Sequence, residues 1–264
     1  MNTDLLITHF EKLWKNAPDQ FPSFETAYSR EMQKEREACF SGYLEKFRSR
    51  QEEIRSAGYD QERFFTAFRK FMKKVYDYAD ESLDIILHPD MVRVTRTFFS
   101  QARAFDSGLK SEEIYQAVRN VWIMNSLQLL LGLKSELTPS IFAYSLLYPY
   151  SDNILDDPAI TREEKRLFSE RFEQRLHGVA AMDDNSREAK ISELVGMIED
   201  QYPREQYPDV HGSLLAIHRA QTRSLRLLAD GGNLPEDEVL SICFDKGGAS
   251  VLADGFLVAG QASP

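Results

Sequence analysis

Apolar residues recur at spacings of three and four along almost the whole chain, which is the period of a helix with one buried face. No stretch alternates apolar and polar residues between Asn-Gly or Asp-Gly turns, as hairpin strands do. The pattern therefore predicts an all-α fold. The expected helices cover residues 3–15, 24–56, 60–86, 89–105, 111–131, 138–157, 161–180, 187–201, 208–229 and 236–261.

Start signals and charge distribution suggest how these helices are organised. Ser111 and Thr161 each place a hydroxyl before acidic residues, as an N-terminal cap does, and Pro235 stands where a first turn needs no N–H donor. Residues 1–88 carry more charge and a weaker apolar period than the rest, and no repeat or Gly/Ser/Pro-rich linker interrupts the chain. We expect an N-terminal helical extension over 1–88 that packs on a helical core over 89–264.

Composition narrows the classes of function. The 264 residues include 32 Lys and Arg against 42 Asp and Glu, so the net charge is −10, the opposite of the basic surface that a nucleic-acid-binding protein presents. Only Cys39 and Cys243 occur, and Asp4 stands where a secretory signal would carry basic residues, so we expect a cytoplasmic protein. The longest apolar runs, such as 141–150, fall short of the roughly 20 residues that span a bilayer. A peripheral membrane contact and a homodimer stay open.

The most informative segment is the acidic end of the helix expected at 138–157. Asp152 and Asp156 are four residues apart and project from one helix face, with Asp157 beside them. Acids at the C-terminal end of a helix oppose its dipole, so a cation would compensate them; Mg²⁺ is a hard ion that one or two carboxylates and substrate phosphates hold. The alternative is an exposed helix end that runs into an Asp-Asp-Pro turn.

A second segment interrupts the last apolar helix with Lys246, Gly247 and Gly248. Glycine inside a helix costs about 1 kcal/mol relative to alanine, so a pair of glycines suggests that something approaches closely. One interpretation is a locally loosened helix that admits a ligand, with Lys246 as a point charge for phosphate. The other is a close crossing of two helices beside a surface lysine.

Two further apolar stripes contain polar residues that must find partners if they are buried. Asn125 and Gln128 interrupt the helix expected at 111–131, and His218 and Gln221 interrupt the helix expected at 208–229. These residues either bind a ligand in an apolar cavity or form a hydrogen-bonded network inside the core. On the adjoining face of the second stripe, Arg219, Arg223 and Arg226 either clamp a phosphate or carry plain surface charge.

Two segments, about ninety residues apart, resemble the motifs of class I isoprenoid synthases. They are Asp152-Asn153-Ile154-Leu155-Asp156-Asp157 and Lys246-Gly247-Gly248-Ala249-Ser250-Val251-Leu252-Ala253-Asp254. The resemblance covers about residues 90–264 and is closest in motif to the large bacterial terpene synthases related to tetraprenyl-β-curcumene synthase. It implies a helical bundle around a central apolar cavity, in which Asp152, Asp156 and Asp157 bind Mg²⁺ and the diphosphate of a prenyl substrate. It also implies that Lys246, Gly247 and Gly248 contact that substrate.

The same resemblance assigns side chains to the cavity. Leu147 and Tyr148 stand about one turn before Asp152, where prenyl diphosphate synthases place the pocket floor. Tyr144, Tyr148 and Trp122 would line the cavity and stabilise carbocations, or else belong to an aromatic core.

Departures from the family pattern set the remaining expectations. Asn153 replaces the usual second acid, and neither the family's second acidic motif nor its Gly-Lys-x-x-Arg motif occurs in this sequence. We therefore expect a bundle that lacks its last helices and is inactive as it stands, with the apolar helix at 236–260 uncovered and prone to self-association.

The leading hypothesis is an enzyme of isoprenoid biosynthesis, a terpene synthase that ionises an allylic prenyl diphosphate with Mg²⁺ and then cyclises or couples the cation. The alternatives are a prenyl diphosphate synthase or a prenyltransferase like squalene and phytoene synthases, and a non-catalytic helical scaffold.

Overall fold

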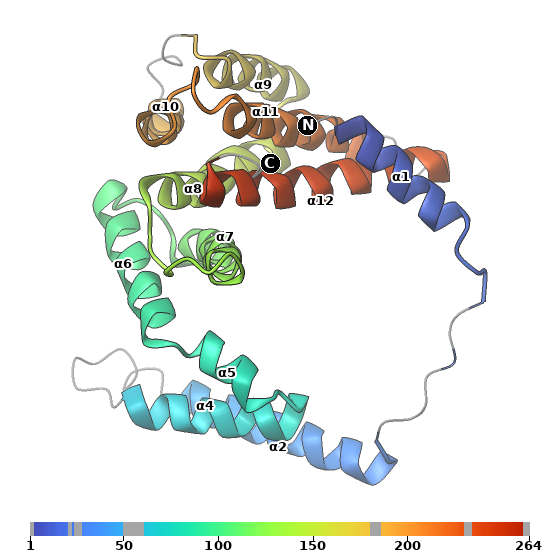
Figure 1. Ribbon diagram of the computed structural model, residues 1–264, viewed down its shortest axis with the longest axis vertical. Coiled ribbons are helices and arrows are strands. Elements are labelled where there is room, and N and C mark those ends of the chain that lie inside the picture. Colours follow the sequence, from blue (N-terminus) through green and yellow to red (C-terminus); the bar gives the residue numbers. More distant parts are fainter. Residues whose placement is uncertain are drawn as a thin grey trace. The chain divides into compact units, whose positions relative to one another are not determined.

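The computed structural model describes residues 3–20, 23, 28–49, 61–179, 186–229 and 234–260, and within these residues every regular element is a helix (Figure 1). The prediction of an all-α protein is confirmed. The contacts divide the chain into a larger unit, residues 1–17 with 93–264, and a smaller unit, residues 18–92. The expected boundary after residue 88 lies close to this division, but the first helix belongs to the larger unit instead of the N-terminal extension.

The smaller unit contains α2 (Arg30–Ser49), α4 (Gln61–Tyr76), α5 (Asp80–Ile86) and the first residues of α6 (Pro89–Phe105). Tyr43 stacks on the buried Phe71, with ring centroids 4.1 Å apart. The helix expected over 24–56 extends over 30–49, and its expected flanks at 24–27 and 50–56 lie outside the described residues.

The single helix expected over 60–86 is interrupted at Asp77. This residue has a φ of 52°, a left-handed conformation that Asp tolerates better than most residues. Both nitrogens of one guanidinium fork stabilise the interruption, because Arg36 Nη2 donates to both Asp77 carboxylate oxygens at 2.8 Å and Nη1 donates to Val75 O at 2.8 Å. The apolar period does not reveal this interruption, because the period continues on both sides of it.

The larger unit is a bundle around α8. Its helices are α1 (Thr3–Lys15), most of α6, α7 (Ser111–Leu130), α8 (Pro139–Asp156), α9 (Arg162–Leu176), α10 (Ser186–Gln201), α11 (Pro208–Ala229) and α12 (Glu236–Ala259). α8 packs against α7, α10, α11 and α12, and Ile141, Ala143 and Leu146 on α8 are completely buried. Burial on several sides explains why α8 has a nearly continuous apolar sequence instead of a single apolar stripe.

The expected N-terminal cap is found at α9, whereas the cap of α7 is one residue earlier than expected. Thr161 caps α9 as predicted, since its hydroxyl accepts from Glu164 N at 3.3 Å while the Glu164 carboxylate accepts from Thr161 N at 2.8 Å. Ser111 is the first helical residue of α7 and not its cap. There the carboxylate of Glu113 accepts from Lys110 N at 2.7 Å, so a side chain from inside the helix satisfies the free backbone donor.

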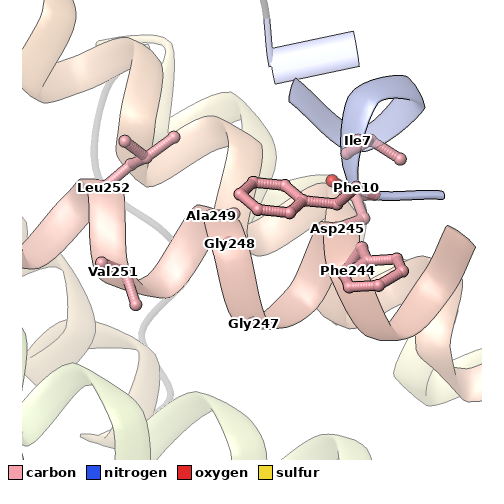
Figure 2. A pocket seen from close by; sticks show the side chains of 9 residues that line it. All are labelled: Ile7, Phe10, Phe244, Asp245, Gly247, Gly248, Ala249, Val251 and Leu252. Atoms are coloured by element: carbon pink, nitrogen blue, oxygen red, sulfur yellow. The ribbon is translucent and has the colours of Figure 1, made fainter. Parts of the chain in front are cut away.

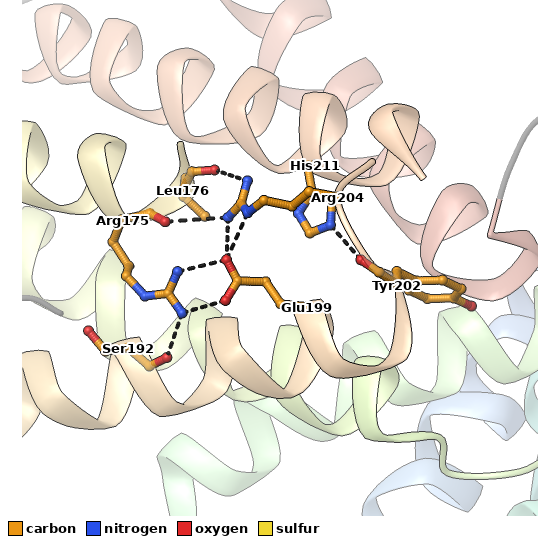
Figure 3. Close-up of polar contacts among 7 residues, drawn as sticks. All are labelled: Arg175, Leu176, Ser192, Glu199, Tyr202, Arg204 and His211. Atoms are coloured by element: carbon orange, nitrogen blue, oxygen red, sulfur yellow. Dashed lines mark hydrogen bonds and ion pairs between the residues drawn. The ribbon is translucent and has the colours of Figure 1, made fainter. Parts of the chain in front are cut away.

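A polar cluster joins α9, α10 and the segment that follows α10 (Figure 3). Glu199 Oε2 accepts from Arg175 Nη2 at 2.7 Å, and Glu199 Oε1 accepts from Arg204 Nη2 at 2.6 Å. Arg204 Nη1 also donates to Leu176 O at 2.7 Å, which satisfies a carbonyl at the end of α9. Nearby, His211 Nε2 lies 2.7 Å from Tyr202 O.

Helix α12 has neighbours on several sides. α1, α7, α8 and α11 all contact it, and α1 (blue in Figure 1) lies against α12 (red) although the two are at opposite ends of the sequence. The expectation that this helix is uncovered is therefore wrong for most of its described residues, although Val251 remains 63% exposed. α12 ends at Gly260, whose φ of 77° strains any other residue, and a Cβ atom there would lie only 3.1 Å from the rings of Tyr202 and Tyr207. None of the described helices combines the length and apolar character needed to cross a bilayer.

Candidate functional site

The three acids predicted to share a site lie at the end of α8 but differ in exposure. Asp152 is buried, with 6% of its surface exposed, whereas Asp156 is exposed. Asp157 is the C-cap of α8, and its Oδ1 accepts from Ala159 N at 2.8 Å. Asp157 thus has the turn role that was the alternative interpretation of this segment, and only Asp152 faces the interior.

Helix α11 links the two segments that the sequence singles out. Gln221 Nε2 donates to Asp152 Oδ1 at 3.5 Å. Two residues further along α11, Arg223 Nη1 lies 3.6 Å from Asp245 Oδ2, and Arg223 Nη2 donates to Ser241 Oγ at 3.0 Å. Two helical residues rise by about 3 Å. The acidic end of α8 and the Lys246 region of α12 therefore lie at nearly the same level of the bundle, but on different sides of α11, because two residues also turn by about 200°.

A small cavity lies between α8, α9 and α11. Its volume is about 30 Å³, which is roughly the volume of one water molecule. Its lining residues are Tyr144, Leu147, Ser151, Phe172, Leu176, Leu214, Ile217, His218 and Gln221, of which Leu147, His218 and Gln221 are among the residues predicted to contact a substrate. The side chain of Tyr148 lies outside the described residues. This cavity is smaller than the ligand sites of about 300–1,000 Å³ that small molecules occupy.

His218 is a hydrogen-bonded core residue. Its Nε2 lies 3.0 Å from Ser169 O, which can only accept, so Nε2 carries the proton in this arrangement. Its ring meets Phe172 edge to face, with centroids 4.8 Å apart. Burial lowers the pKa of His218, which favours the neutral imidazole, and its Nδ1 is buried without a hydrogen bond. His218 therefore belongs to a hydrogen-bonded network inside the core, which was the alternative to ligand binding, although its Nδ1 remains an unused acceptor.

Asn125 and Gln128 join α7 to the loop before α8. Asn125 Nδ2 donates to Gln128 Oε1 at 2.8 Å and to Glu136 O at 3.1 Å, and Gln128 Oε1 also accepts from Glu136 N at 3.1 Å. The backbone N–H and C=O groups of Glu136 are therefore both hydrogen-bonded to side chains from α7. This is the core network that was the alternative to ligand binding.

Two other predicted residues lie on the surface. Arg219 Nε donates to Glu173 Oε1 at 2.7 Å in an exposed ion pair, which is the surface-charge alternative. The side chain of Arg226 lies outside the described residues. Trp122 is 42% exposed and its Nε1 donates to Thr95 Oγ1 at 2.9 Å, so the prediction that it lines the central cavity is wrong. A lone Trp on an apolar stripe does not reveal which helix face it occupies.

The two glycines of α12 do not mediate a close helix crossing. A Cβ atom at Gly247 or Gly248 would meet nothing within 4 Å. The helix-crossing alternative is therefore wrong, and the glycines instead leave space beside α12. Lys246 is half-buried and points away from that space, because successive side chains are rotated by about 100° around a helix.

The structure also points to a residue that the sequence analysis did not single out. Asp254 on α12 is 3% exposed, and its Oδ1 has no hydrogen bond. Burial raises the pKa of Asp254 to about 7. Such groups concentrate at functional sites, although structural positions also perturb pKa values. The signal was visible, since an acid stands in the otherwise apolar run Val251-Leu252-Ala253-Asp254-Gly255-Phe256.

The acids fit a limited role toward Mg²⁺. In the part of the chain that the structure describes, no three His, Cys, Asp or Glu side chains are grouped to hold a metal ion. Mg²⁺ itself is usually bound by one or two protein carboxylates, with water and phosphate oxygens completing its coordination. Asp152 and Asp156 can supply that smaller share. Comparisons with models of known families, with curated proteins and with solved structures gave no match to this chain.

Proposed function

We propose that this protein is a class I isoprenoid synthase-like enzyme that ionises an allylic prenyl diphosphate with the help of Mg²⁺, followed by cyclisation or coupling of the cation. The observation that carries the proposal is the convergence on α11. Gln221 contacts Asp152, and Arg223 contacts Asp245 next to Lys246, so one helix touches both segments at nearly the same level of the bundle.

The roles of the residues follow from their chemistry. Asp152 and Asp156 would hold Mg²⁺, which when bound neutralises charge on the diphosphate leaving group. Gln221 orients the Asp152 carboxylate by donating to Oδ1. Lys246 would bind a diphosphate oxygen as a point charge, because an ammonium group donates in several directions. Leu147 and Tyr144 would contact the prenyl chain from α8.

One observation favours a non-catalytic helical scaffold instead. The cavity beside Asp152 has a volume of about 30 Å³, and a prenyl chain would need several times that space. Under the enzyme hypothesis, substrate binding has to move α9 or α11 away from α8. Under the scaffold hypothesis, the cavity is a packing defect and stays closed.

A thermal-shift experiment separates these functions. Inorganic diphosphate with Mg²⁺ at a hundredfold excess over Kd should raise the Tm of the enzyme by about 5 °C. The double variant Asp152→Asn/Asp156→Asn should lose this shift. Asp200→Asn, which changes an exposed acid on α10, is the matched control and should retain it.

Turnover completes the test. Farnesyl, geranylgeranyl and longer prenyl diphosphates are incubated with the chain and Mg²⁺, and diphosphate release is measured. Release that the double variant loses supports the enzyme. An unchanged Tm with diphosphate and Mg²⁺, together with no release from any substrate, contradicts the proposal and leaves the scaffold.

A further inference from the structure

A groove of about 300 Å³ lies between α1 and α12 (Figure 2). Two residues of α1 contribute to its wall, and the remainder comes from α12. The lining residues are Ile7, Phe10, Phe244, Asp245, Gly247, Gly248, Ala249, Val251 and Leu252. Its volume is at the lower end of the range for small-molecule sites, and about ten times that of the cavity beside Asp152.

The groove exists because two adjacent residues of α12 have no side chains where α1 crosses it. Gly247 and Gly248 face the groove, and a Cβ on either would be in open space. α1 is attached near this point by two contacts with α12. Lys15 Nζ lies 3.0 Å from Asp237 Oδ1, and the rings of Phe10 and Phe244 stack with centroids 6.0 Å apart.

The chemistry of the groove selects an apolar ligand. Among the described residues of the lining, Asp245 is the one that is charged, and Arg223 already contacts its carboxylate at 3.6 Å. At roughly 30 Å³ per heavy atom, the space holds about ten carbon atoms. A partner helix, with a diameter of about 10 Å including side chains, is too wide for this volume. The carboxylate at Asp245 and the net charge of −10 disfavour an anionic head group.

We propose that the α1–α12 groove binds a single hydrocarbon chain of about ten carbons whose polar end is neutral or cationic and lies near Asp245. The two glycines admit the chain, and Phe10 covers it from α1. This site is separate from the acidic end of α8 and does not depend on Mg²⁺ or on diphosphate chemistry.

Calorimetric titration of the full chain tests the proposal with defined probes. 1-Decanol and geraniol represent straight and prenyl chains of equal carbon number, and 1-butanol is the short control. Both long probes should bind at least tenfold more tightly than 1-butanol. Decylamine should bind at least as tightly as 1-decanol, and decanoate at least threefold more weakly. The ratio between 1-decanol and geraniol shows which kind of chain the groove prefers.

Matched leucine variants locate the binding. Gly248→Leu places a side chain in the groove, whereas Gly255→Leu is on the same helix and nearly the same face, two turns further on and outside the lining. A Cβ at either position meets nothing within 4 Å, so both variants should fold. Gly248→Leu should weaken 1-decanol binding at least tenfold, and Gly255→Leu should change it less than twofold.

Three results would overturn the proposal. The first is no binding of either long probe by the parent chain. The second is equal binding by the parent and Gly248→Leu, which places the probe elsewhere. The third is a parent dimer that Gly248→Leu converts to a monomer in light scattering, without probe binding, which would mean that a second copy fills the groove. Loss of Mg²⁺-dependent turnover in the acidic variants leaves all of these readouts unchanged.

Discussion

Two acids of the larger unit, Glu199 on α10 and Asp254 on α12, have opposite surroundings. Glu199 accepts hydrogen bonds from the guanidinium groups of Arg175 and Arg204 (Figure 3), and these donors lower its pKa to about 2. Asp254 is more deeply buried, its Oδ1 has no hydrogen bond, and burial raises its pKa to about 7.

The contrast separates two uses of a carboxylate. The Glu199 cluster joins α9 to α10 and to the segment that follows, so its charge stabilises the arrangement of helices. The Asp254 carboxylate stabilises no described contact through Oδ1, and its charged form opposes folding. Retaining a buried carboxylate with an unbonded oxygen lowers the stability of the fold, and such positions are common where a side chain has a functional role.

The largest effect is expected for Glu199→Gln. A neutral amide leaves at least one guanidinium without its anionic partner, and breaking a buried pair costs about 3–5 kcal/mol. We expect a loss of about 2–3 kcal/mol in the free energy of unfolding, because Glu199 keeps 24% of its side chain exposed. Urea denaturation at pH 7 measures this loss.

Glu163→Gln is the matched control for that substitution. Glu163 also pairs with an arginine, Arg166, but its side chain is 65% exposed, so solvent screens the pair and the loss should be much smaller than for Glu199→Gln. Because the pKa of Glu199 is lowered in the folded state, its contribution is present above about pH 4.5 and disappears as the pH falls toward 2. Equal losses for the two variants at pH 7 would remove the distinction between the cluster and a surface pair.

The second prediction is that Asp254→Asn raises the free energy of unfolding, whereas Glu199→Gln lowers it. Since the folded-state pKa is raised, the folded protein holds a proton that the unfolded chain releases, and stability falls as the pH rises from about 4 to 7. The variant removes this dependence. Its stability relative to the parent should grow over that window, with a slope below the limiting value of about 1.4 kcal/mol per pH unit, and level off above about pH 7.

Asp200→Asn provides the comparison, because it makes the same chemical change at an exposed position on α10. Its difference from the parent should be small, because an exposed carboxylate keeps its contact with water. Denaturation curves at pH 5, 6, 7 and 8 give both differences. A pH-independent difference for Asp254→Asn would show that the carboxylate is already ionised with a partner across this range.

The sequence predicts the helices of the larger unit well, and physical reasons explain where it fails. The helices at 3–15, 89–105 and 208–229 have the expected bounds, because each has one sustained apolar period. The interruption at Asp77 depends on the distant Arg36, and the packing of α1 on α12 joins opposite ends of the chain. Periodicity contains no information about either contact.

The candidate site was predicted in part. The spacing of Asp152 and Asp156 places both on one side of α8, but only packing by α11 buries Asp152 and leaves Asp156 exposed. The polar residues Asn125, Gln128 and His218 were recognised as unusual, while their partners Glu136 and Ser169 could not be recognised, since those contacts are mostly to backbone atoms. A sequence shows which groups need partners and not which atoms supply them.

The smallest effect is expected for Tyr150→Phe, which tests an acid between the two extremes. Asp106 has no arginine fork, but the Tyr150 hydroxyl donates to Oδ2, Gly108 N donates to Oδ1 at 2.8 Å, and these donors lower the pKa of Asp106. Removing one neutral donor from a carboxylate should cost about 1–1.5 kcal/mol.

Tyr115→Phe is the control, because its ring packs edge to face on Phe99 while the residue is 60% exposed, and it should cost almost nothing. The pKa of Asp106, followed by carboxyl NMR, should rise in Tyr150→Phe and stay constant in Tyr115→Phe. If Tyr150→Phe lost about 1 kcal/mol of unfolding free energy while the pKa of Asp106 stayed unchanged, Tyr150 would act by packing alone. Neutral donors would then not explain why the Asp106 pKa is lowered.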